Sequence, residues 1–336
     1  MPTIKDVARH AGVAVSTVSR VLNGTGYVSP DTREKVDHAI AQLGFRPNKL
    51  ARGLISRTSY TIALILSDVS NPFFAAMIKG VEAEARAAGY SVIVGNAEQD
   101  PEVVTAWVDG LRGHWVNGVL FATAPRHEDI QILREEQIAW AFIDNDLDGV
   151  ECDQILVDHR EGARAATRHL LELGHRRIGH ISGPRRPSAF TRLLGFLEAL
   201  QEAGIEPRPE WISEYGGYTF DHGYKAMQVM LQIPAGQRPT GIFCVNDLSA
   251  VGALQAASDA GLEVPRDISI VGYDDIVWAR LLRPTLTTVS QPVEELGRRA
   301  TRLLLRRITE ESPGAFERVV LKSSLVVRQS TAAPGS

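Results

Sequence analysis

A short stretch near the N-terminus, VAVSTVSRVLN (residues 13–23), gathers hydrogen-bonding side chains on one side of a predicted helix. If its apolar residues face a core, the opposite side carries Val15, Ser16, Ser19 and Arg20. Serine hydroxyls near a helix start can contact phosphate oxygens, and an arginine guanidinium can bind a guanine edge through two hydrogen bonds. A helix in the major groove of DNA uses this chemistry, but an ordinary solvated helix face carries the same residue types. Periodicity alone does not decide between the two interpretations.

Three short helices would position these side chains. Apolar residues at i, i+3, i+4 and i+7 predict the first helix over residues 4–11, and the same reasoning predicts the second over residues 15–22. The third begins after Ser29, a favoured N-cap residue that is followed by proline. Gly44 ends it, because glycine tolerates the left-handed backbone found just beyond helices.

The charge of the chain is unevenly distributed. Residues 1–58 contain nine Lys and Arg against four Asp and Glu, whereas the remainder contains 27 basic and 36 acidic residues. A basic N-terminal segment on an acidic body favours a polyanionic partner for that segment. Many small domains carry a similar charge for solubility, so this signal is weak by itself.

From Tyr60 onward the pattern changes to alternating strands and helices. Near-continuous apolar runs such as TIALIL, NGVLFAT, TGIFCVN and ISIVGY alternate with amphipathic segments such as residues 73–88. Strands that are apolar along their whole length are typical of parallel sheets covered on both faces. The alternation occurs twice, so we expect two α/β halves with a cleft at the carboxyl ends of their strands.

The residues do not indicate a metal site, a cofactor or catalysis. His169, His175 and His180 lack the spacing of a zinc site, and the chain contains no P-loop, dinucleotide-binding glycine motif or nucleophile elbow. We therefore predict no metal, no cofactor and no enzymatic activity. Cys152 and Cys244 are expected to be reduced and buried, and the N-terminus lacks the apolar core of a secretory signal. With no membrane span expected either, we predict a cytoplasmic protein.

Specific motifs resemble the lactose-repressor (LacI/GalR) family of bacterial transcriptional regulators. TIKDVARHAGVAVSTVSRVLNG resembles the helix-turn-helix of that family, and YVSPDTREKVDHAIAQLGFRPNKLARGL resembles its third helix and hinge. The likeness continues through SNPFF, LGHRRI, RLLGF, VNDLSAVGAL, VGYDD and PTLTTVSQPVEELG, and so covers nearly the whole chain. Ala14 departs from the pattern, because many members have a serine there that can cap the second helix.

The resemblance implies an all-α helix-turn-helix head joined by a hinge to an α/β body of two Rossmann-like subdomains, as in periplasmic binding proteins. The expected head spans residues 1–46, the hinge 47–59 and the body 60–330. Within the body, the expected subdomains are residues 60–160 with 290–320, and residues 161–289 with 321–330.

The resemblance also implies which residues contact DNA. Val15, Ser16 and Arg20 would read base edges, and a leucine of the hinge would enter the minor groove from each half of a dimer. We expect the hinge to fold on binding DNA, although an ordinary linker leucine is the alternative. The full expected set is Thr3, Val15, Ser16, Thr17, Ser19, Arg20, Asn23, Ala51, Arg52 and Leu54.

The cleft would hold a small-molecule effector. Asn246 and Asp274 end apolar strands and offer hydrogen-bonding groups, although Asn246 could simply cap the next helix. Arg192 matches an effector-contacting arginine of the family, and Phe73 matches a position where an aromatic ring flanks the ligand, although a core role is equally open. The full expected set is Phe73, Asp144, Arg192, Phe220, Asn246, Asp274 and Trp278.

These inferences predict a homodimeric repressor that binds a pseudopalindromic double-stranded operator and responds to an effector, most simply a sugar. Two alternatives stay open. The effector could be a purine or another non-sugar metabolite, which the same polar and aromatic side chains would suit. The chain could also be an α/β enzyme acting on a sugar or nucleoside, with the head as an oligomerisation module.

Overall fold

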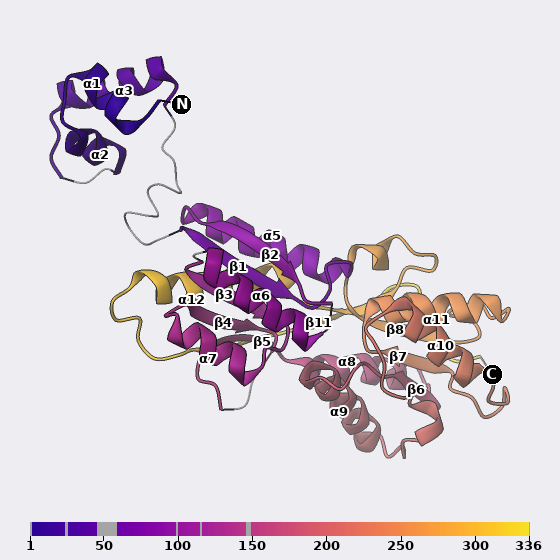
Figure 1. The fold of residues 1–336 in the computed structure, drawn as a ribbon. Helices are drawn as coiled ribbons and strands as arrows, with labels where there is room; N and C mark the ends of the chain where they lie inside the picture. The colour runs from indigo at the N-terminus through magenta and orange to yellow at the C-terminus, as the bar shows by residue number, and fades with distance from the viewer. Residues whose placement is uncertain are drawn as a thin grey trace. The chain divides into compact units, whose positions relative to one another are not determined.

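The computed structural model describes residues 2–23, 26–45, 59–98, 100–114, 116–145 and 149–335 (Figure 1). The chain forms two compact units, Met1–Tyr60 and Thr61–Ser336. Among the described residues, no helix is long and apolar enough to cross a membrane.

The first unit, called the head below, contains three helices over its described residues: α1 (Ile4–Ala11), α2 (Val15–Asn23) and α3 (Pro30–Leu43). One small apolar core joins them, and apart from Val15 the exposed residues of the helices are mostly polar, as expected for amphipathic segments. The buried members of this core are Val7, Ala8, Val18, Val21, Val36 and Ala39.

Capping residues set where the first and third helices of the head begin. Thr3 and Asp6 form a reciprocal capping box at the start of α1, and the Ser29 hydroxyl accepts a hydrogen bond from the Thr32 amide at the start of α3. Gly12 follows α1 with φ +67°, a backbone conformation that glycine adopts without strain. Ala14 precedes α2, and its carbonyl oxygen accepts from the amides of Thr17 and Val18, but its methyl group offers no cap.

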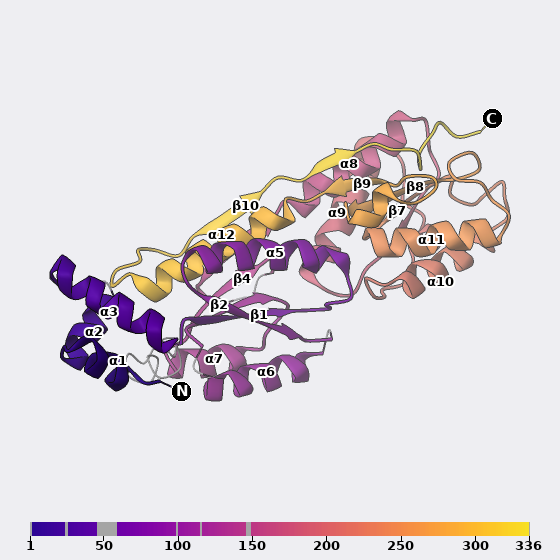
Figure 2. The same cartoon turned by 90° about the horizontal axis from the view of Figure 1, so that it is seen from above.

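The second unit, called the body below, contains two sheets. The first sheet has the strand order β10-β5-β4-β3-β1-β2, and all of its strands are parallel. Helices α5 and α12 cover one face and α6 and α7 the other (Figure 2). Its elements are β1 (Thr61–Leu66), α5 (Pro72–Ala87), β2 (Ser91–Asn96), α6 (Pro101–His114), β3 (Gly118–Ala122), α7 (His127–Glu135), β4 (Ala139–Ile143), β5 (Asp153–Val157), α12 (Val293–Thr309) and β10 (Arg318–Leu321).

The second sheet has the order β11-β9-β8-β7-β6, and only the edge strand β11 runs antiparallel to its neighbour. Helices α8 and α9 cover one face, and α10 and α11 cover the other (Figure 1). Its elements are α8 (His159–Glu172), β6 (Ile178–Ile181), α9 (Pro187–Glu202), η1 (Pro209–Trp211), α10 (Phe220–Leu231), β7 (Gly241–Cys244), α11 (Asp247–Asp259), β8 (Ser269–Asp274), η2 (Val277–Arg280), β9 (Thr287–Ser290) and β11 (Ser324–Val326).

The two sheets belong to two lobes. Lobe 1 comprises residues 61–157 and 293–321, and lobe 2 comprises residues 159–290 and 324–335. The chain passes between the lobes three times: from β5 to α8, from β9 to α12, and from β10 to β11. Because each crossing is only a few residues long, the lobes can change their mutual orientation only by bending these three segments.

Each lobe has its own apolar core. Cys152 is buried in the core of lobe 1 and Cys244 in that of lobe 2, and both are free thiols. Helices α5 and α12 approach closely over the first sheet, and Gly80 permits this because it has no Cβ atom, which would overlap the carbonyl oxygen of Glu294. The apolar cores therefore account for the packing within each lobe. They do not account for the polar side chains that lie between the lobes.

Candidate functional site

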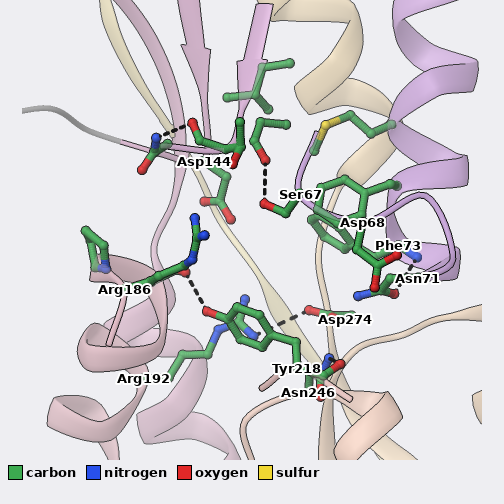
Figure 3. Close-up of a pocket in the computed structure, with 18 residues that line it drawn as sticks. Ser67, Asp68, Asn71, Phe73, Asp144, Arg186, Arg192, Tyr218, Asn246 and Asp274 are labelled. Carbon is green, nitrogen blue, oxygen red and sulfur yellow. Dashed lines mark hydrogen bonds and ion pairs between the residues drawn. The ribbon is translucent and has the colours of Figure 1, made fainter. Parts of the chain in front are cut away.

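A cavity of about 80 Å³ lies between the two lobes, at the carboxyl ends of strands from both sheets (Figure 3). Lobe 1 contributes residues that follow β1, β3 and β4, together with the first turns of α5. Lobe 2 contributes the start of α9, Tyr218, Asn246 and Asp274. This is the place where parallel α/β sheets usually bind ligands, because loops with free polar groups meet there.

Arg192 extends from α9 and is held by several partners at once. Its Nη1 donates to the carbonyl oxygen of Val245 at 2.6 Å and lies 3.6 Å from Asp274 Oδ1. The guanidinium carbon sits 3.8 Å from the centre of the Tyr273 ring, which adds a cation–π contact. Burial alone would lower the pKa of Arg192, but Asp274 and Tyr273 outweigh it and raise that pKa. The cavity thus contains a permanently cationic group in a fixed position.

Asp274 ends β8 and faces Arg192 (Figure 3). Burial raises the pKa of its carboxyl group to about 7, even though Arg192 and the amide of Gln291 both favour the charged form. The Gln291 Nε2 donates to Asp274 Oδ1 at 2.7 Å. Asp274 has φ +117°, which is rare for a residue other than glycine and is found at functional sites more than elsewhere.

Asp144 follows β4 on the opposite side of the cavity. Its Oδ1 lies 2.7 Å from Nε2 of His159 and accepts from the Val157 amide at 3.3 Å. Burial raises the pKa of Asp144, but His159 and the charge of Arg192 outweigh burial and hold it below the usual range. Asp144 is therefore an anionic acceptor at neutral pH.

Asn246 caps α11, which was the alternative role expected for it. Its Oδ1 accepts from the Ser249 amide at 2.9 Å and from the Ser249 hydroxyl at 2.6 Å, and its Nδ2 donates to the carbonyl oxygen of Tyr218 at 3.1 Å. The side chain also lines the cavity, where one N–H of the amide is left for a ligand. The two roles are compatible.

The aromatic residues divide into two groups. Phe73 lines the cavity and packs edge-to-face against Phe74, with ring centres 5.2 Å apart. Phe220 and Trp278, which were expected at the ligand, are not among the cavity-lining residues and are 39% and 43% exposed. Phe220 instead stacks on Tyr224 one turn further along α10, since residues i and i+4 share a helix face.

Several lining residues escaped the sequence analysis. Ser67 and Thr123 follow buried strands of lobe 1, so the reasoning that selected Asp144 would also have found them. Tyr218 comes from a loop with no periodic signal and Ser188 from the first turn of α9, and their hydroxyls lie 2.9 Å apart. The others are Asp68, Asn71, Phe74, Met77, Ala122, Ile143, Asn145, Arg186 and Pro187.

The residues expected to contact DNA lie mostly on α2. Val15, Ser16 and Arg20 are exposed, whereas Thr17 and Ser19 are half-buried. Asn23 is the last residue of α2, and Ala51, Arg52 and Leu54 fall outside the described residues. Thr3 has a structural role in the α1 capping box, where its hydroxyl donates to Asp6 Oδ2 at 2.7 Å.

The fold and the cleft together define a class: a small helical head carrying an exposed polar helix, attached to a two-lobed body with an interlobe ligand cavity. Comparisons with known proteins place the chain in a particular family. Residues 3–48 match the model of bacterial regulatory proteins of the lacI family, and residues 167–331 match a periplasmic binding protein-like domain.

Relatives resemble the chain over nearly its whole length. The HTH-type transcriptional repressor PurR of Haemophilus influenzae (strain PittEE) is 37% identical over 334 residues, covering 98% of each chain. The ribose operon repressor of Haemophilus influenzae (strain ATCC 51907 / DSM 11121 / KW20 / Rd) is 38% identical over 331 residues, again with 98% of each covered. The crystal structure of the lac repressor dimer, bound to operator and the anti-inducer ONPF, matches with a TM-score of 0.86 and 31% identity over 99% of both chains.

The chain therefore belongs to the lacI family of bacterial regulatory proteins. It is a ligand-responsive, DNA-binding transcriptional repressor with a helix-turn-helix head and a periplasmic-binding-protein-like body.

Proposed function

We propose that the chain is a homodimeric repressor whose interlobe cavity binds a neutral sugar of about monosaccharide size, and that this binding changes its affinity for a pseudopalindromic operator. The observation that carries the proposal is the fixed pairing of donors and acceptors around the cavity. Arg192 offers only donors, Asp144 only acceptors, and Asn246 an N–H, so they suit hydroxyl groups that both donate and accept.

The charge and size of the cavity support a small neutral ligand. The cavity is lined by two arginines, Arg186 and Arg192, and three aspartates, Asp68, Asp144 and Asp274. The raised pKa of Asp274 lowers the total negative charge of these side chains near neutral pH. Nearly balanced charge does not favour a phosphorylated ligand. The cavity volume of about 80 Å³ favours a small ligand over a large one.

A purine base is the second candidate, because its ring nitrogens could also pair with Asp274 and Arg192. We prefer a sugar because its hydroxyl groups both donate and accept, which matches the donors of Arg192 and the acceptors of Asp144. The relatives include both PurR and a ribose operon repressor and so do not decide between the two ligand classes. Binding alone accounts for the regulatory role, so the proposal contains no chemical step. Because the target is the bacterial chromosome, we place the protein in the cytoplasm.

The head would read DNA through the exposed face of α2. Arg20 and Ser16 would recognise base edges, and Val15 would suit a thymine methyl. Phosphates would be contacted by Thr17, Ser19 and Asn23, with Thr3, the residue before α1, as a further candidate. In a two-fold dimer, two heads would meet two half-sites, and Ala51, Arg52 and Leu54 would lie near the centre of the operator. A ligand that changes the angle between the lobes would alter the spacing of the heads. It would shift DNA affinity only as far as it binds the two states unequally.

A thermal-shift screen tests the effector class. The full-length protein is heated with neutral pentoses and hexoses, with purine bases and with sugar phosphates. A ligand at 100 times its dissociation constant should stabilise the body by about 2.7 kcal/mol. Trp278→Ala, outside the cavity, should respond as the unchanged protein does, and Asp274→Asn should not respond. Stabilisation by purine bases alone would replace the sugar by the purine alternative.

Selection of bound duplexes from a random pool tests the DNA part. We expect an inverted repeat whose recovery changes when the stabilising compound is added. Recovery of no preferred duplex in either condition would contradict the proposal.

A further inference from the structure

His159 is the first residue of α8, two positions after β5 ends, and thus stands in one of the three crossings between the lobes. It is 6% exposed and does not line the cavity. Its two ring nitrogens nevertheless contact residues of both lobes. Nε2 lies 2.7 Å from Oδ1 of Asp144 in lobe 1, and Nδ1 lies 3.3 Å from Nε of Arg192 in lobe 2.

The identity of its partners fixes the direction of both hydrogen bonds. An arginine has donors only, so Arg192 Nε–H must donate and His159 Nδ1 must accept. The proton of a neutral imidazole then resides on Nε2, which donates to the Asp144 carboxylate. The Tyr273 hydroxyl, 3.2 Å from Nδ1, is placed to donate to the same lone pair. A chain of hydrogen bonds therefore runs from Asp144 through His159 to Arg192.

Both ends of this chain are cavity-lining side chains, and both are otherwise anchored. Asp144 has φ +52°, an unusual conformation for a residue other than glycine, and its amide donates to the carbonyl oxygen of Ile155 at 2.7 Å. Arg192 is anchored on the carbonyl oxygen of Val245. A change in the angle between the lobes would stretch the two His159 hydrogen bonds, because their acceptor and donor belong to different lobes.

We propose that His159 is a positioning residue that links the two lobes through one donated and one accepted hydrogen bond, and so sets the separation of Asp144 and Arg192 across the cavity. This inference rests on the proposed function of the cavity, and it adds the element that couples ligand contacts to lobe orientation. A ligand that forms a hydrogen bond with Asp144 or Arg192 can weaken or strengthen the hydrogen bonds that these residues form with His159. In both cases the preferred angle between the lobes changes.

The groups facing His159 support a neutral ring. Burial lowers the pKa of His159, and Arg192 acts in the same direction, whereas Asp144 and Asp158 oppose them. Tyr273 faces the ring from β8. A second proton would place an N–H of His159 against the N–H of Arg192, so acidification should break the link on the lobe 2 side.

Two substitutions separate hydrogen bonding from packing. His159→Gln retains one donor and one acceptor on neighbouring atoms, whereas His159→Leu fills the buried position with an apolar side chain and has neither. If His159 only packs, hydrogen exchange in the leucine variant should stay closer to that of the unchanged protein than exchange in the glutamine variant does. If His159 links the lobes, the order should be reversed.

The first readout needs no ligand. Hydrogen exchange of the full-length protein is followed at residues 141–145 in lobe 1 and 243–247 in lobe 2, with α6 as an internal control. We expect His159→Leu to raise exchange in both segments by about tenfold, the effect of losing a hydrogen bond to a charged group. His159→Gln should stay within about threefold of the unchanged protein, and exchange in α6 should not change. Equal exchange in the two variants would overturn the proposal.

The second readout is calorimetric binding of D-ribose between pH 5 and pH 8. The affinity of the unchanged protein, divided by that of His159→Gln, should be constant from pH 8 to pH 7, where burial keeps the ring neutral, and can fall only towards pH 5, where the histidine gains a proton. Asp144, Asp158, Arg192, Tyr273 and Asp274 are present in both proteins, so their titration contributes to both affinities. A ratio that already falls between pH 8 and pH 7 would contradict a neutral linking ring. If the unchanged protein and its glutamine variant bind no sugar at all, the proposed function fails, while the exchange experiment still decides the role of His159.

Discussion

The exposed face of α2 and the interlobe cavity place their functional side chains in opposite environments. Ser16 and Arg20 stand in solvent, whereas Arg192 and Asp274 are buried and bonded to their surroundings. A side chain on the surface can be selected for its partner alone. A buried charged side chain also supports the fold, because removing one member of a buried pair leaves the other uncompensated. We therefore expect substitutions in the cavity to change both stability and ligand response, and substitutions on the exposed face of α2 to change only DNA binding.

The largest effect is expected for Arg192→Ala. The substitution leaves Asp274 buried without its cation and removes the donor to Val245, which should destabilise the body by about 3–5 kcal/mol. Urea denaturation of the full-length protein measures this loss. A matched control is Arg299→Ala, which removes an exposed arginine paired with Glu295 and should cost less than about 1 kcal/mol. Similar losses in the two variants would remove the distinction between buried and exposed charges.

Asp274→Asn should change the pH dependence of stability. The pKa of Asp274 is raised to about 7 in the folded body from 3.8, so between these values the folded state holds a proton that the unfolded chain has released. Its contribution to stability is complete at low pH and is lost as pH rises through 7. The free energy of unfolding of the unchanged protein, relative to Asp274→Asn, should fall by a few kcal/mol between pH 4 and pH 8. A flat difference would show that Asp274 is charged throughout.

Arg20→Ala tests the exposed face of α2. It should weaken binding to the selected operator by about 1–3 kcal/mol and relax the preference at one base pair, with stability unchanged within about 0.5 kcal/mol. Lys35→Ala removes the same charge from an exposed position of α3 and should weaken binding equally for all sequences. The Arg20 assignment is wrong if both variants lose the same affinity with no change in sequence preference.

The smallest effect is expected for Thr3→Ala. Loss of the capping box should destabilise α1 by about 1 kcal/mol, seen as faster hydrogen exchange of the α1 amides in the full-length protein. Thr3→Ser keeps the hydroxyl and should retain most of the protection. A loss of operator affinity without faster exchange would instead assign Thr3 to the DNA contact inferred from sequence.

Much of the architecture could be predicted because local signals were strong. The capping residues Ser29 and Gly44 marked the ends of α3, and apolar runs marked β1 and β8. Strands β9, β10 and β11 lack such runs and were not predicted. β9 is buried but short and contains two threonines and a serine, whereas β10 and β11 are short and partly exposed.

The cavity was predictable where residues directly follow strands or match a motif of the family. Asp144 and Asp274 were found in this way, and Arg192 through the family resemblance. Phe220 was expected from the family resemblance and Trp278 for its chemical type, but neither lines the cavity, since the direction of a side chain depends on the face of the element that carries it. His159 carried no local signal, since its role arises from Asp144 and Arg192, which are distant from each other in sequence and belong to different lobes.

The most direct test of the account is a titration of the selected operator with the full-length protein, at one salt concentration, with and without the sugar that stabilises the body. We predict that the sugar changes operator affinity at least fivefold in the unchanged protein, roughly the lower end of allosteric coupling. In His159→Leu the same sugar should leave operator affinity unchanged. Equal operator affinity with and without saturating sugar in the unchanged protein would contradict the claim that the cavity controls the head.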